Sequence, residues 1–132
     1  MFNNSEIKQL LLMGFILTTI DVTFLNFFFK SVFGKMIKNI QNKEMKVNYF
    51  GAIYAYVLLC LGLYYFIIRE NKSPLDAFLL GVFVYGVYEG TSYALLNKWE
   101  IKVLVMDSLW GGVLFALTTF IFNSIKTMFI RY

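Results

Sequence analysis

Apolar residues fill four long stretches of the chain, and polar residues gather between them. A helix needs about 20 mostly apolar residues to span the hydrocarbon core of a bilayer. Four stretches reach that length, at about residues 7–29, 49–68, 75–96 and 101–122. The pattern therefore predicts an all-α integral membrane protein with a single transmembrane domain over residues 1–132.

The connections between these stretches indicate how the helices are arranged. Residues 69–74 form a polar turn that ends in Pro74, which is placed to begin a helix. Residues 97–100 form an even shorter connection. Because short connections make consecutive helices antiparallel neighbours, we expect an up-down bundle of four transmembrane helices.

The connection between the first two stretches is longer and has a different pattern. From about residue 31 to 46, apolar residues recur at helical spacing and lysines fall between them. This pattern predicts an interfacial amphipathic segment that lies in the plane of the membrane surface. A solvated loop is the alternative, because Gly34 weakens a helix. The apolar positions are Val32, Phe33, Met36, Ile37 and Ile40.

Composition argues against a soluble fold. Hydrophobic residues make up 59% and aromatic residues 20% of only 132 residues. A soluble domain of this size leaves too much surface exposed to hide so much apolar area. The lipid bilayer is therefore the expected partner, and the expected location is integral membrane and multi-pass. The net charge of +4 lies almost entirely outside the apolar stretches. That distribution fits contact with anionic headgroups and not with nucleic acid.

Three of the apolar stretches each contain one carboxylate, at Asp21, Glu89 and Asp107. A charge near the bilayer centre costs roughly 2.5–3.5 kcal/mol, and no lysine or arginine lies deep enough to compensate it. In antiparallel helices that rise about 1.5 Å per residue, all three fall roughly 4–8 Å from the midplane on the same side. We therefore expect the three acids to form one ion- or proton-binding site.

Polar neighbours complete this expected site. Several lie one helical turn from an acid or on the same helix face. Tyrosine and tryptophan can donate hydrogen bonds to a carboxylate without adding charge. The expected polar shell consists of Thr18, Tyr85, Tyr88, Ser92, Tyr93 and Trp110.

A stripe of small residues, Gly86, Gly90 and Ala94, lies beside the face that carries Glu89. Small residues allow two helices to approach closely. The stripe could serve packing within the bundle, or it could form a homo-oligomer.

Missing residue types exclude several cofactors. The chain has no histidine, which excludes His-ligated haem and His-based zinc sites. The single cysteine, Cys60, excludes an iron–sulfur cluster within one chain. Retinal is not expected, because no lysine lies in the middle of a span. The remaining oxygen ligands suit protons, or Na⁺, Ca²⁺ or Mg²⁺.

Three short motifs resemble those of a known family. That family, catalogued as domain of unknown function 2177, has Asp-x-x-Trp in helix one and Tyr-x-x-Tyr-Asp-Leu-Thr-Asn in helix three, with a later Trp. Helix four has Asp-x-x-Trp-Gly. The matching residues here are 21–24, 85–92 with Trp99, and 107–111. The resemblance implies four helices and the same acidic positions, and it implies no activity.

The last of these motifs agrees fully, and the other two depart from the family pattern. Phe24 stands for tryptophan and Glu89 for aspartate, while Gly90 and Ser92 replace leucine and asparagine. Position 89 keeps an acidic residue, with a side chain longer than that of aspartate, and the motif keeps a hydroxyl residue.

Three functions fit these features. The first is a carboxylate site that binds or relays protons or a cation, as in a small channel or transporter. The alternative is a structural or assembly subunit whose acids act as neutral hydrogen-bond glue. A membrane enzyme acting on a lipid or isoprenoid, with the carboxylates as general acid and base, is the least favoured.

Overall fold

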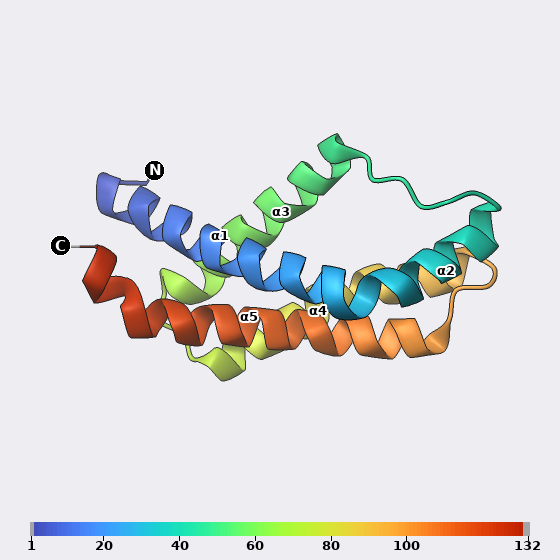
Figure 1. The fold of residues 1–132 in the computed structure, drawn as a ribbon. Coiled ribbons are helices and arrows are strands. Elements are labelled where there is room, and N and C mark those ends of the chain that lie inside the picture. Colours follow the sequence, from blue (N-terminus) through green and yellow to red (C-terminus); the bar gives the residue numbers. More distant parts are fainter. Residues whose placement is uncertain (1, 131–132) are drawn as a thin grey trace.

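The computed structural model describes residues 2–130, and all regular structure in that range is helical (Figure 1). The all-α prediction is confirmed. Residues 1, 131 and 132 of the predicted domain lie outside the described range. In chain order the elements are α1 (Asn4–Phe24), the π-helical turn η1 (Leu25–Phe29), α2 (Lys30–Gln41), α3 (Tyr49–Leu63), the π-helical turn η2 (Tyr64–Ile68), α4 (Pro74–Leu95) and α5 (Ile101–Phe129).

Three continuous helices are long and apolar enough to cross a membrane: Asn4–Gln41, Tyr49–Ile68 and Ile101–Phe129. The sequence predicted four spans. The remaining helix, α4, is 22 residues long, but it is less apolar because it carries two acids, three tyrosines and two hydroxyl residues. Three candidate spans are therefore established by length and composition.

The first helix is longer than the sequence predicted. Asn3 begins it with a capping box, in which its side chain accepts from the Glu6 backbone and Glu6 accepts from the Asn3 backbone. The chain stays helical through the wider turn of η1 and through α2. It ends where Asn42 adopts a left-handed φ of 59°.

The apolar side of α2 packs against the connection between α4 and α5. Met36 is fully buried with Phe29, Trp99 and Val103. The backbone N–H of Glu100 donates to the Met36 Sδ at 3.3 Å. This side of the predicted amphipathic segment therefore contacts protein.

Helices α4 and α5 form the closest helix pair, and glycines allow their approach. A Cβ added at Gly81 would clash with the backbone oxygen of Gly111. Of the predicted small-residue stripe, only Gly86 faces α5, where such a Cβ would lie 3.8 Å from the Ser108 Oγ. Gly90 has no neighbouring atom within 4 Å of such a Cβ, and Ala94 is exposed. The tight crossing thus uses Gly81, which lies earlier in α4 than the stripe.

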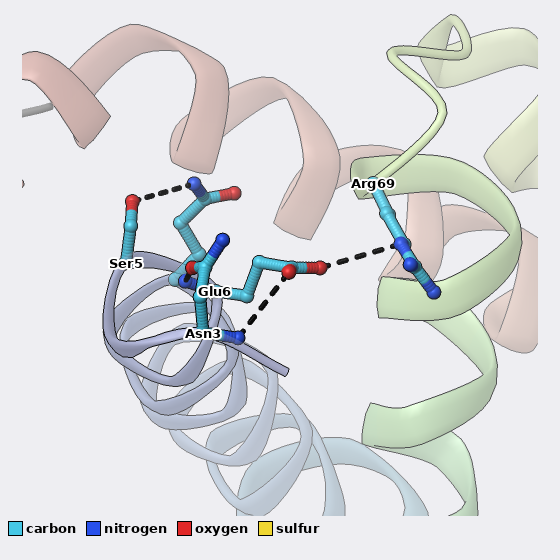
Figure 2. A network of polar contacts seen from close by, with 5 residues as sticks. Asn3, Ser5, Glu6 and Arg69 are labelled. Carbon is cyan, nitrogen blue, oxygen red and sulfur yellow. Dashed lines mark hydrogen bonds and ion pairs between the residues drawn. The ribbon is translucent and has the colours of Figure 1, made fainter. Parts of the chain in front are cut away.

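The main core joins α1, η2 and α5, with Leu17, Tyr64 and Phe115 among its buried residues. At the end of the molecule where both termini lie (Figure 1), Glu6 of α1 pairs with Arg69 after η2 at 3.3 Å. Figure 2 shows this pair beside the helix cap. These contacts tie the start of α1 to the end of the second span.

Helix α3 diverges from the other helices toward its start (Figure 1). Leu63, at its last turn, is the buried residue of α3, and most of the helix is exposed. Consequently α3 packs closely only over its later half, and grooves lined by residues of α1 and α4 open beside it.

Candidate functional site

The three predicted acids come from three helices, and the structure brings them together. Asp21 on α1 is 5% exposed, Glu89 on α4 is fully buried and Asp107 on α5 is 7% exposed. Asp107 interacts electrostatically with both of the others. A single buried carboxylate cluster therefore links α1, α4 and α5.

Asp21 accepts hydrogen bonds from two neutral donors. The Tyr56 hydroxyl donates to Oδ2 at 2.5 Å, and the Trp110 indole N–H donates to Oδ1 at 2.9 Å. Phe24 stacks on the Trp110 ring with centroids 3.8 Å apart, which fixes the orientation of the indole.

Tyr56 was missed by the sequence analysis. It lies in the second apolar stretch, which has no charged residue and several other tyrosines. Nothing in the sequence pattern separates the tyrosine that faces Asp21 from those that face outward.

Only one of the two carboxylate oxygens of Glu89 accepts a hydrogen bond from a donor among the described residues. The Trp99 indole N–H donates to its Oε1 at 2.9 Å. Its Oε2 is buried and accepts from no donor among the described residues. The Asp107 carboxyl interacts electrostatically with Glu89 within the cluster. Glu89 and Asp107 are therefore a neighbouring pair of buried carboxyls.

The described residues contain no basic partner for this cluster. Their ion pairs use Glu6, Glu44 and Glu100, all near helix ends or in connections. Among residues 2–130, no group of three acidic, cysteine or histidine side chains has a geometry that could hold a metal ion. The burial of these acids is therefore offset by hydrogen bonds from neutral donors and by interactions among the acids themselves.

Only some members of the predicted polar shell lie near the acids. Trp110 binds Asp21, while Tyr85 and Tyr88 line a groove beside the acids. Ser92 interacts with Tyr88. Thr18 and Tyr93 lie away from the acids on exposed helix surfaces: Thr18 lines a separate groove between α1 and α3, and Tyr93 is 49% exposed.

A groove of about 480 Å³ opens between α3 and α4 beside the cluster. Asp21 and Asp107 line it together with tyrosines and aliphatic residues of the two helices. The aromatic lining comes from Tyr54, Tyr56, Tyr85 and Tyr88. Two of the three acids are therefore reachable from outside the protein.

Long apolar helices around a buried carboxylate cluster define a multi-pass integral membrane protein. The chain belongs to the predicted membrane protein family DUF2177, whose sequence profile matches residues 6–123. The family resemblance of the three motifs is thereby confirmed. No curated protein and no solved structure matches the chain.

Proposed function

We propose that the protein binds and relays protons within the membrane at the Glu89–Asp107 pair. The observation that supports this proposal is that the two carboxyls are buried neighbours that interact, because two bare carboxylates close together would repel each other. One proton held between them turns the repulsion into a hydrogen bond.

The surroundings of the pair favour a proton over a metal ion. The groups that face it are Asp21 from α1, Tyr85 and Tyr88 from α4, and Trp99 from the connection that follows α4. None of these is basic. With no three-ligand cluster among the described residues, a proton is the cation that the pair can hold.

Transport by a chain of this size needs all four long helices in the membrane. We propose that α4 is a fourth span, because it packs along α5 and its mid-helix acid, Glu89, is fully buried and accepts a hydrogen bond from Trp99. In this arrangement α2 lies at the membrane surface, with Lys30, Lys35 and Lys38 facing headgroups.

The test is a pH gradient across liposomes that contain the purified protein. We expect the wild type to dissipate the gradient and Asp107→Asn to abolish that activity. Asp76→Asn is the matched control, because Asp76 is an exposed acid in the first turn of α4. A wild type that leaves the gradient intact would contradict proton relay.

A second function has specific support. The bonds from Tyr56 and Trp110 to Asp21, and from Trp99 to Glu89, join separate elements through neutral donors. Such bonds could hold an assembly subunit together without any transport. In that case the acid variants would change stability and no flux would be found in the wild type.

A further inference from the structure

The groove between α3 and α4 has a character that proton binding does not explain. Its rim is aromatic and open, with Tyr54 61% exposed and Tyr88 52% exposed. Its inner end carries Asp21 and Asp107. Its volume of about 480 Å³ lies within the range of small-molecule sites, roughly 300–1,000 Å³.

The charge within this groove is not balanced by the protein. No lysine or arginine lines it, and the donors that bind Asp21 are neutral. A negative charge at low dielectric attracts a cation strongly. Tyrosine faces add cation–π attraction for an organic cation.

Asp107 supplies an independent indication of a ligand. It is more than nine-tenths buried and lines the groove. The groups that act on it among the described residues are the acids Glu89 and Asp21, so no basic or amide donor satisfies it. A positively charged group in the groove would complete its surroundings.

The geometry of α3 provides access from the bilayer. The helix is anchored near Leu63 and diverges toward its start, and the residues along its outer part are exposed. An apolar molecule dissolved in the membrane can therefore reach the groove between Leu58 and Val84, which line its two walls. A ligand with apolar groups and one positive charge fits this groove, because its apolar groups match the walls and its charge matches the acids at the inner end.

We propose that this groove binds a lipophilic organic cation, with its positive centre beside Asp21 and Asp107 and its apolar groups against Tyr54 and Val84. The proposal rests on the proposed function in one respect, namely that Glu89 and Asp107 hold a single proton and so keep one negative charge beside the groove. It adds a substrate class to that site.

The experiment measures saturable binding of tetraphenylphosphonium to the full chain in lipid nanodiscs by equilibrium dialysis. Tetraphenylborate, which has the same shape and the opposite charge, is the matched ligand control. We expect binding of the cation only, and at least a tenfold loss of affinity in Asp107→Asn. Asp76→Asn should bind like the wild type.

Two further variants separate the groove from the acids. Val84→Trp fills the groove and should abolish binding, whereas Val87→Trp, at an exposed position outside it, should leave binding unchanged. Thermal unfolding of each variant shows whether it is folded. Tyr54→Leu, at the exposed rim, should weaken binding severalfold in a folded protein.

Three results would overturn the proposal: no saturable binding, equal binding of tetraphenylborate, or equal binding by Val84→Trp and the wild type. A dimer that Val84→Trp dissociates would also overturn it, because a second copy would then occupy the groove. Proton relay is separable from this result, since Val84→Trp keeps both members of the carboxyl pair.

Discussion

The indole of Trp99 donates a 2.9 Å hydrogen bond to Glu89, which lies ten residues earlier in the chain and is fully buried. Trp99 is itself buried, with Phe33 of α2 and Tyr88 of α4 packed edge-on against its ring. One side chain therefore connects α2, the α4–α5 connection and the buried acid pair.

Removal of that donor should destabilise the protein. Trp99→Phe keeps an aromatic ring for the contacts with Phe33 and Tyr88 but leaves Glu89 without its donor. We expect a loss of about 1–3 kcal/mol in the free energy of unfolding, the cost of an unsatisfied buried polar group. Denaturant unfolding in detergent micelles measures it. Trp99→Phe in a Glu89→Leu background should cost clearly less, and an equal cost would contradict a direct bond.

The two donors to Asp21 should also be separable. Tyr56→Phe and Trp110→Phe each remove one hydrogen bond to this carboxylate. Each should lower stability by about 1–3 kcal/mol, the cost of leaving a buried polar group without its partner. Tyr54→Phe, two positions away and exposed, is the control and should have no effect. Equal stability of all three variants would show that the bonds do not form.

The glycine contact between α4 and α5 predicts a contrast within one helix. Gly81→Ala places a methyl group against the Gly111 backbone and should cost about 1–3 kcal/mol or more through overpacking. Gly90→Ala meets no atom and should stabilise the helix by roughly 0.5–1 kcal/mol. Thermal unfolding of the two variants checks both signs. If Gly90→Ala were the damaging change, the predicted small-residue stripe would be the packing face.

Docking of α2 on the protein gives a further prediction. Met36→Ala opens a cavity at a fully buried position and should cost about 2–5 kcal/mol. Lys35→Ala, the exposed neighbour, should change stability by less than about 0.5 kcal/mol. Limited proteolysis of the connection at residues 42–48 is the measurement, because a released α2 exposes it. Equal cleavage of both variants would mean that α2 does not depend on this contact.

Much of the architecture could be predicted from the sequence because the signals are strong over many residues. Apolar length marks Tyr49–Ile68 and Ile101–Phe129, and three isolated acids in apolar surroundings indicate a shared site. Antiparallel counting places Asp21 and Asp107 at one level, and the structure has them interacting. These inferences depend on spacing along a helix, which the sequence contains.

Rotation of each helix about its axis could not be predicted. The long helices are apolar on all sides, so no amphipathic face indicates which residues point inward. This explains why Thr18 lies outward and why Tyr56 was missed. It also explains why the tight crossing uses Gly81 and not Gly90. The continuation of the first helix through η1 was missed because π-helical turns have no clear sequence signature.

The central claim is that Glu89 and Asp107 share one proton, and infrared spectroscopy of the carboxyl groups tests it most directly. A protonated carboxyl has a carbonyl stretch separate from that of a carboxylate, and it shifts in heavy water. At neutral pH we expect such a band in the wild type and in Asp76→Asn, and its loss in the double variant Glu89→Gln with Asp107→Asn. Absence of the band in the wild type, or its persistence in the double variant, would contradict the shared proton.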